Sequence, residues 1–177
     1  MALHFERDEY AARLGRLTAR MREEKLGAVL LFAQESMYWL TGYDTFGFCF
    51  FQCLVVEADG TMALLTRSAD LRQAQQTSNL GDIRIWKDGR DADPTADLLA
   101  LTRDLGLAGK RIGVEFESYG LVASNYRKLE ARFVGQVELV DQTRGRHTVA
   151  DDDQRFTHET SPIQRPAAVR RRPRTSC

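Results

Sequence analysis

Cysteine and histidine side chains, which serve as metal ligands and nucleophiles, occur mainly in two parts of the sequence. Cys49 and Cys53 are four residues apart in a predicted strand, so both should point to the same face of a sheet. They could bind a metal only with partners that the sequence does not offer nearby, and we expect two buried thiols acting as small hydrophobic side chains. His147 and His158 flank the acidic run 151–153, but that segment lacks the rigidity that a metal site requires. We therefore predict no metal site in this chain.

The short motifs of the common catalytic classes are also missing. The sequence contains no G-x-G-x-x-G loop, no Walker loop, no H-E-x-x-H pair and no G-x-S-x-G nucleophile turn. The remaining histidine, His4, lies near the N-terminus and should be exposed. No serine, histidine and acid are placed so that a catalytic triad can be argued. We predict a scaffold or binding domain with no catalytic residue of its own.

Residues 34–53 are unusually rich in aromatic side chains. A core role is the simplest interpretation for Trp39, Phe50 and Phe51, because a buried strand needs such residues. Other aromatic residues of the segment lie around Gly42 and Gly47, where the chain should be irregular.

Aromatic residues on a loop provide a large contact area at low entropic cost, so an interface or ligand wall stays open here beside simple packing. The candidate residues that would line a substrate or an interface are Tyr43, Asp44, Phe46 and Phe48. We predict that this segment is a loop at a sheet end, with at least two aromatic side chains partly exposed.

The elements that must position this loop follow from hydrophobic periodicity. Tyr10, Leu14, Leu17 and Met21 form the stripe of an amphipathic helix that ends near Gly27. By the same reasoning we predict further helices at 34–40, 69–76, 94–105 and 122–133, and strands at 28–32, 48–57, 61–66, 82–86, 111–116 and 136–140.

Two local signals support this assignment. Asp59-Gly60 supplies the turn of a β-hairpin, which makes the sheet mixed. Asp93-Pro94 is an N-cap followed by a proline at the first helical position. About six strands alternating with helices predict an α/β fold, a three-layer sandwich with a mixed sheet of about six strands flanked by helices.

The charge distribution divides the chain near Asp141. Residues 142–177 contain eight arginines, four acidic residues and three of the four prolines, whereas residues 1–141 contain 17 basic and 21 acidic side chains. We predict a folded domain over residues 1–141 and a mostly disordered Arg/Pro-rich tail over 142–177, because the tail has too little apolar surface to offset its ordering entropy. The run 170–172 could contact nucleic acid, but a solvated end is the favoured interpretation.

Composition restricts the partners and the location. The 177-residue chain has 25 basic and 25 acidic residues, so no overall basic field favours nucleic acid or an anionic membrane. No apolar run reaches the length of a membrane helix, and the start of the chain is too charged for a signal peptide. Three cysteines do not form a disulfide framework. We expect a cytoplasmic protein.

Several segments together resemble the N-terminal domain of the creatinase, prolidase and aminopeptidase P family. The first is the element Tyr38 to Tyr43 (YWLTGY), which follows a strand and a leading amphipathic helix. The resemblance covers residues 5–141 and continues through segments 63–67, 83–86 and 110–115. Ser36 is a departure, because many relatives carry asparagine before this element.

The resemblance implies a fold with a six-stranded mixed sheet and a non-catalytic role. In the family, a C-terminal "pita-bread" domain carries the chemistry, usually with two divalent metal ions such as Mn²⁺, Co²⁺ or Zn²⁺. None of those ligand positions can be matched here, so the chain is expected to be truncated and inert alone, with no cofactor of its own. The tail could result from a change of reading frame or could be a native segment.

The family resemblance also implies a homodimer, or a partner catalytic domain, in which this domain contributes to dimerisation and to the substrate pocket of a partner subunit. Phe50 lies near the position of an arginine in creatinase, and a phenylalanine cannot bind a carboxylate in the same way, which disfavours creatinase activity. The substrate stays open among Xaa-Pro dipeptides, ectoine-like compounds and others. The alternative function is a stand-alone pseudo-enzyme module that binds a peptide or protein through the aromatic loop.

Overall fold

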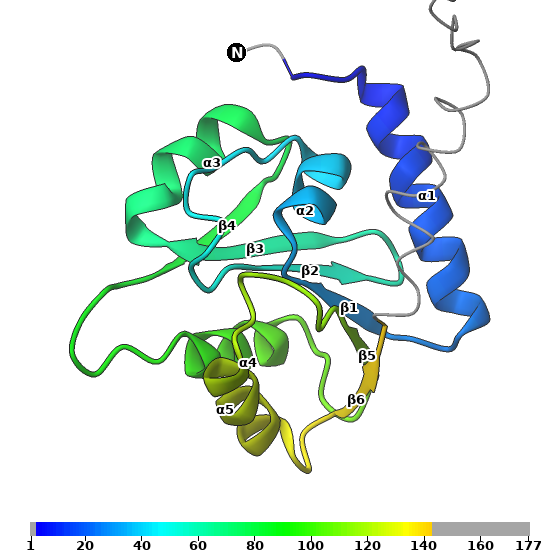
Figure 1. The fold of residues 1–177 in the computed structure, drawn as a ribbon. Coiled ribbons are helices and arrows are strands. Elements are labelled where there is room, and N and C mark those ends of the chain that lie inside the picture. Colours follow the sequence, from blue (N-terminus) through cyan, green and yellow to red (C-terminus); the bar gives the residue numbers. More distant parts are fainter. Residues whose placement is uncertain (1–2, 143–177) are drawn as a thin grey trace, which may run out of the picture.

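The computed structural model describes residues 3–142, which form one six-stranded sheet covered by helices on both faces (Figure 1). The strand order is β4-β3-β2-β1-β5-β6. The neighbouring pairs β1–β5, β3–β4 and β5–β6 are parallel, whereas β2 is antiparallel to both β1 and β3. The strands are β1 (Ala28–Leu31), β2 (Cys53–Glu57), β3 (Met62–Arg67), β4 (Asp82–Trp86), β5 (Arg111–Val114) and β6 (Glu138–Asp141).

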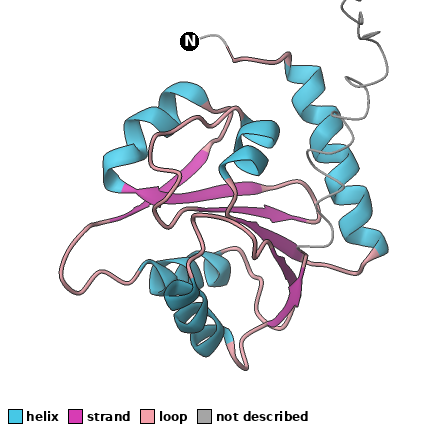
Figure 2. Cartoon of the chain, in the orientation of Figure 1, coloured by secondary structure: helices cyan, strands magenta, loops and turns pink. Residues whose placement is uncertain are grey.

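The helices divide between the two faces of the sheet, which gives three layers (Figures 1 and 2). One hydrophobic core lies beneath α4 and α5, and a second core lies beneath α1, α2 and α3. The helices are α1 (Arg7–Glu23), α2 (Gln34–Thr41), α3 (Leu71–Thr77), α4 (Pro94–Asp104) and α5 (Ala123–Phe133), with a short 3₁₀ turn η1 (Ser68–Asp70) before α3. The predicted mixed α/β sandwich is confirmed.

Both local signals act as predicted. The Asp93 side chain accepts a hydrogen bond from the backbone N–H of Thr95 at 3.2 Å and so caps the start of α4. In the β2–β3 hairpin, Gly60 has a φ of +98°, a conformation that glycine adopts without steric cost. The Asp59 carboxylate accepts a hydrogen bond from the backbone N–H of Thr61 at 2.8 Å, which stabilises the same turn.

The predicted strand 48–57 is wrong in its first half. Strand β2 begins only at Cys53, and residues 46–49 form a turn instead. The turn is closed by the buried Gln52 side chain, which donates a hydrogen bond to the carbonyl oxygen of Gly47 at 2.7 Å. Cys49 is consequently exposed, contrary to the prediction of two buried thiols, whereas Cys53 is buried.

Other expectations fall on residues 143–177, which lie outside the described residues. These are the disorder of the tail and the statements about His147, His158 and the acidic run 151–153. The last described strand ends at Asp141, next to the predicted domain boundary. None of the helices in the described part, residues 3–142, is both long and apolar enough to cross a membrane.

Candidate functional site

The candidate site lies at the edge where the strands β1, β3, β4 and β5 end. These strands and β6 run in one direction, and β2 runs against them, so the carboxyl ends of five strands lie on the side where β2 starts. The chain leaves β1 toward β2 on one side and later returns to β5 on the other side. In open α/β sheets, ligands bind outside the carboxyl ends of the strands at such a change of direction. The loop formed by residues 42–52, between α2 and β2, covers this edge.

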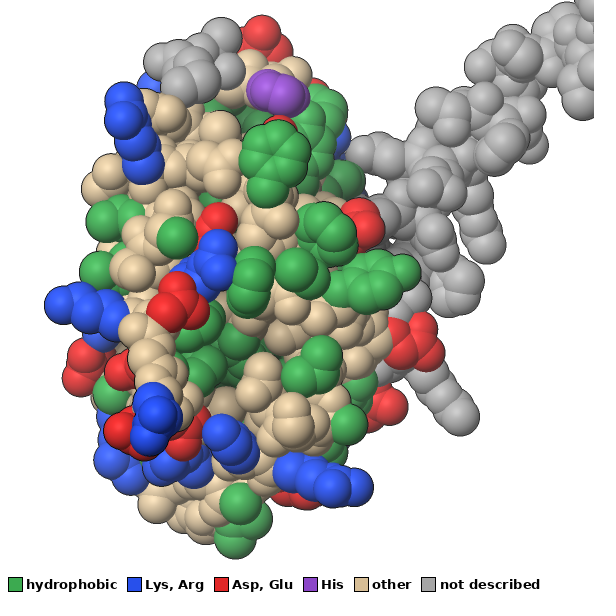
Figure 3. Space-filling view, turned by 60° about the vertical axis from the view of Figure 1, so that its left-hand side comes forward, with side chains coloured by type: hydrophobic (Ala, Val, Ile, Leu, Met, Phe, Trp, Pro, Cys, Tyr) green, Lys and Arg blue, Asp and Glu red, His purple; other side chains and the backbone are tan. Residues whose placement is uncertain are grey.

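Four large aromatic side chains are exposed together at this edge, and we call them the aromatic face: Phe46, Phe48, Phe50 and Tyr119. Phe46 is 90% exposed and Tyr119 is 76% exposed, whereas Phe48 and Phe50 are about half exposed. The rings of Phe48 and Tyr119 meet edge-on with centroids 6.1 Å apart. Figure 3 shows hydrophobic side chains gathered over the middle of one side of the molecule. Such an exposed apolar patch is typical of an interaction surface.

Close packing of two loops creates this juxtaposition. A Cβ atom on Gly120 would lie 2.9 Å from the carbonyl oxygen of Phe32 and 3.3 Å from that of Phe50. The loop after β5 therefore lies directly against the 42–52 loop, and a larger side chain than glycine would push them apart.

The four predicted site residues differ in their exposure. Phe46 and Phe48 are exposed on the loop, as predicted, and Asp44 is exposed beside them. Tyr43, however, is completely buried, so it cannot line an interface. Its phenol ring packs in the core beneath α1, α2 and α3. The expectation that Phe50 has a core role is also wrong, because its side chain is 42% exposed.

Tyr43 instead anchors the loop through a buried polar network. Its hydroxyl donates a hydrogen bond to the side-chain oxygen of Gln52 and lies 3.0 Å from the hydroxyl of Thr66. Thr66 in turn donates to the same oxygen of Gln52 at 2.9 Å. Burial raises the pKa of the Tyr43 hydroxyl, and the hydrogen bond with Thr66 partly offsets this rise. The network holds both ends of the loop against β3.

Asp70 forms a second anchor below the turn. Its buried carboxylate accepts hydrogen bonds from Thr45 Oγ1 at 2.9 Å and from Arg67 Nε at 3.2 Å. A Cβ atom on Gly47 would lie 2.6 Å from both carboxylate oxygens, so this position requires glycine. The guanidinium of Arg67 also covers the ring of Phe50 at 3.7 Å from its centroid, a cation–π contact.

Glu115 fixes the start of α2, the helix that leads into the loop. Its buried carboxylate accepts hydrogen bonds from the backbone N–H groups of Phe32 and Ala33, at 2.9 and 2.7 Å, and from Ser36 Oγ at 2.6 Å. A negative charge at a helix N-terminus is favourable, because it complements the helix dipole and the unpaired N–H groups. At the other end of α2, Gly42 has a φ of +78° and forms the C-cap.

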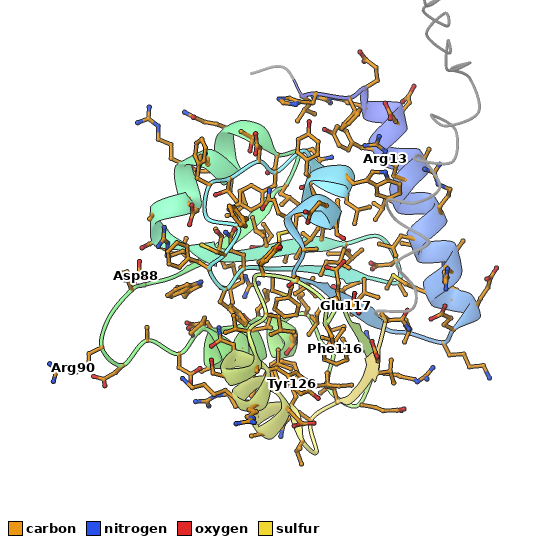
Figure 4. All side chains as sticks on the ribbon, in the orientation of Figure 1. Arg13, Asp88, Arg90, Phe116, Glu117 and Tyr126 are labelled. Carbon is orange, nitrogen blue, oxygen red and sulfur yellow. The ribbon has the colours of Figure 1, made fainter. Side chains whose placement is uncertain are left out.

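Charged side chains surround the aromatic face. Asp44 and Glu117 are exposed and lie two residues before Phe46 and Tyr119, respectively. Asp88 lies 3.8 Å from Arg67 and begins the long loop between β4 and α4. Figure 4 shows Arg90 at the outer end of that loop, pointing away from the sheet.

The metal-ligating and nucleophilic side chains of the described residues lie apart from one another or are buried. Among residues 3–142, no three His, Cys, Asp or Glu side chains come together so that they could hold a metal ion. Burial raises the pKa of the Cys53 thiol well above its usual value, and the nearby Glu115 charge raises it further, so this thiol is a poor nucleophile. His4 is exposed as predicted, with Nδ1 2.5 Å from the hydroxyl of Tyr38.

Sequence reasoning missed Tyr119, Arg67, Asp70 and Glu115. Tyr119 is a lone aromatic residue between Ser118 and Gly120 in a predicted loop, which is a weak signal of exposure. Nothing in the sequence indicated that it contacts Phe48, because the two residues come from different strand ends. Arg67 and Glu115 lie at strand ends and Asp70 lies in the short turn η1, where sequence alone does not distinguish a solvated charge from a buried anchor.

Fold and site together define an α/β domain that presents exposed aromatic side chains on a loop held by buried hydrogen bonds. The model of the creatinase/prolidase N-terminal domain matches residues 13–146, and the chain belongs to this family.

Two curated proteins illustrate the relationship. An ectoine hydrolase from Halomonas elongata is 29% identical over 156 residues, which cover 81% of this chain and 39% of that protein. A protein from Sinorhizobium fredii named as an uncharacterized hydrolase/peptidase, y4tM, is 32% identical over 136 residues, which cover 72% of this chain and 34% of that protein. The chain thus spans between a third and two fifths of the length of these relatives.

Solved structures share the fold at lower identity. A dipeptidase from Pyrococcus horikoshii superimposes with a TM-score of 0.61 at 19% identity, over 80% of this chain and 36% of that chain. A proline dipeptidase structure from Streptococcus pneumoniae gives a TM-score of 0.61 at 20% identity, over 83% of this chain and 98% of that chain. The N-terminal domain of the cytoplasmic peptidase PepQ from Mycobacterium tuberculosis gives a TM-score of 0.55 at 21% identity, over 73% of this chain and 92% of that chain. The PepQ domain was therefore crystallised as a separate unit.

Proposed function

We propose that this chain is the non-catalytic N-terminal domain of a hydrolase that acts on Xaa-Pro peptides or on related small amide and C–N substrates. In this proposal, the aromatic face contacts a catalytic domain, contributes to dimerisation and lines the substrate pocket of a partner subunit. The observation that carries the proposal is the exposure of Phe46, Phe48 and Tyr119 on loops held by buried hydrogen bonds. A preordered surface loses less conformational entropy on binding.

The metal chemistry belongs to the catalytic domain in this proposal. The residues described here do not fit a metal site, and no step of hydrolysis is assigned to them. The chain alone should therefore be inert. The names of the relatives, an ectoine hydrolase and a proline dipeptidase, support the substrate class. The description of one structural neighbour as a cytoplasmic peptidase supports a cytoplasmic location.

A first experiment tests inertness. The purified 177-residue chain is assayed with Xaa-Pro dipeptides and with ectoine in the presence of Mn²⁺, Co²⁺ or Zn²⁺. We expect no turnover above the blank. Turnover that persists in repeated, independently purified preparations would contradict the assignment of all chemistry to another domain.

A second experiment tests the role of the aromatic face. The N-terminal part of the Halomonas elongata ectoine hydrolase is replaced by residues 5–141 of this chain, and kcat/KM for ectoine is measured. We expect activity above that of the catalytic part alone. The double variant Phe46→Ser/Phe48→Ser should have a kcat/KM at least tenfold lower than that of the unsubstituted chimera, a change of about 1.4 kcal/mol. Val134→Ser, which alters an exposed side chain directly after α5, should leave kcat/KM unchanged. Equal activity of both variants would favour a stand-alone binding module.

A further inference from the structure

The aromatic face has a candidate occupant within the chain itself. We propose that the arginine- and proline-rich segment 161–174 binds back onto the aromatic face, with proline and arginine side chains on the aromatic rings and arginines paired with acids at the rim. This proposal goes beyond the function proposed above and does not rest on it, because it concerns the 177-residue chain alone. A segment bound there would compete with any other partner of the face.

The chemistry of the face matches the chemistry of the segment. The segment contains Arg165, Pro166, the run 170–172, Pro173 and Arg174. Aromatic-lined surfaces bind proline-rich peptides in extended conformation, and arginine packs on aromatic rings. One such contact already exists inside the face, where the Arg67 guanidinium lies 3.7 Å from the centroid of the Phe50 ring.

Charge complementarity favours the same occupant. The part of the chain up to residue 141 carries 17 basic and 21 acidic side chains, whereas residues 142–177 carry eight arginines and four acids. At the face, the Asp44 carboxylate forms no hydrogen bond or ion pair with any of residues 3–142, and Asp88 reaches Arg67 only at 3.8 Å. Arg67 itself is engaged by the buried Asp70. The rim therefore offers carboxylates to an arginine-rich ligand.

The chain is long enough for this contact. A random-coil connection over the 24 residues from Gln142 to Arg165 would have a root-mean-square span of about 25–30 Å. A domain of this size has a radius of gyration of about 14 Å and a diameter of roughly 36 Å, which the connection can cover because its fully extended length is about 75 Å. Tethering at this length corresponds to an effective concentration of about 1 mM. A segment with a dissociation constant of about 0.1 mM would then be bound roughly ten times more often than free.

Limited trypsin digestion tests the proposal, because the segment contains trypsin sites after Arg170 and Arg171. Mass spectrometry follows cleavage at these two bonds, and each rate is normalised to that of a synthetic peptide of residues 157–177. We expect cleavage in the intact chain to be about tenfold slower than in Phe46→Ser/Phe48→Ser. Asp44→Asn should restore part of the rate, and Val134→Ser should leave it slow. Circular dichroism checks that each variant is folded. We expect folded variants because the substituted side chains are exposed.

The outcomes separate clearly. Slow cleavage in the intact chain and in Val134→Ser, fast cleavage in the double variant and no dependence on protein concentration support the proposal. Equal rates in all variants overturn it. Protection that rises with protein concentration also overturns it, because the segment then comes from a second copy. None of these results depends on a catalytic domain, so failure here leaves the proposed function standing.

Discussion

Replacing Glu115 with alanine should weaken the whole candidate site as well as the fold. The substitution removes the acceptor for two backbone N–H groups and for the Ser36 hydroxyl, which form bonds of 2.6–2.9 Å. A buried donor left without a partner costs about 1–3 kcal/mol, and the Phe32 N–H is buried. Since water can reach the partly buried Ala33 N–H, we expect a total loss of about 3 kcal/mol. That is a large share of the 5–15 kcal/mol by which domains are stable.

Urea unfolding followed by circular dichroism measures this loss, with two variants as controls. Glu115→Gln keeps a carbonyl oxygen for both backbone N–H groups, so it should lose only about 1 kcal/mol, the charge-assisted part of the bonds. Glu23→Ala, at an exposed position near the end of α1, should change stability by less than about 0.5 kcal/mol. If Glu115→Ala is no more destabilising than Glu23→Ala, the carboxylate is not the anchor of α2 described here.

Two further predictions concern the loop. Gly47→Ala should destabilise the domain by about 1–3 kcal/mol in urea unfolding, because its Cβ would lie 2.6 Å from the Asp70 carboxylate, whereas Gly81→Ala, with open space around it, should not. The raised pKa of Tyr43 means that the folded state holds this proton more tightly than the unfolded state, so its contribution to stability is complete below about pH 10 and is lost at higher pH. The urea midpoint should therefore fall as the pH rises above about 10, and less steeply in Tyr43→Phe; parallel slopes would contradict the assignment.

The two hydrophobic cores were largely predictable from the sequence. The stripe Tyr10, Leu14, Leu17 and Met21 and the run 28–32 follow helical and buried-strand periods, and burial of apolar residues is the main driving force for folding. The hairpin and the start of α4 were predictable because each depends on neighbours in sequence. Local chemistry therefore sufficed for most of the fold.

The loop at the sheet end was predictable only in part. An aromatic run is as typical of a buried strand as of a loop. For this reason the predicted strand 48–57 begins too early. The difference is made by Gln52, whose side chain bonds to the backbone of Gly47 and to Tyr43 and Thr66. The contact with Thr66 joins the loop to β3, and hydrophobic periodicity does not predict such a contact. The exposure of Phe46 was predictable because it lies in an irregular segment between two glycines. The burial of Tyr43, three residues earlier, was not predictable, because it depends on contacts with Gln52 and Thr66.

At this edge polar side chains are buried and aromatic side chains are exposed, an arrangement that supports the binding role proposed above. Buried polar residues such as Tyr43, Asp70 and Glu115 contribute less net stability than well-packed hydrophobic residues would, because their desolvation offsets much of what their hydrogen bonds gain. Phe46, at 90% exposure, contributes almost no burial to the fold. A domain selected for stability alone would bury the phenylalanine and omit the polar anchors. The opposite arrangement keeps the aromatic side chains in a fixed position at the surface, which lowers the entropic cost of contact with a partner.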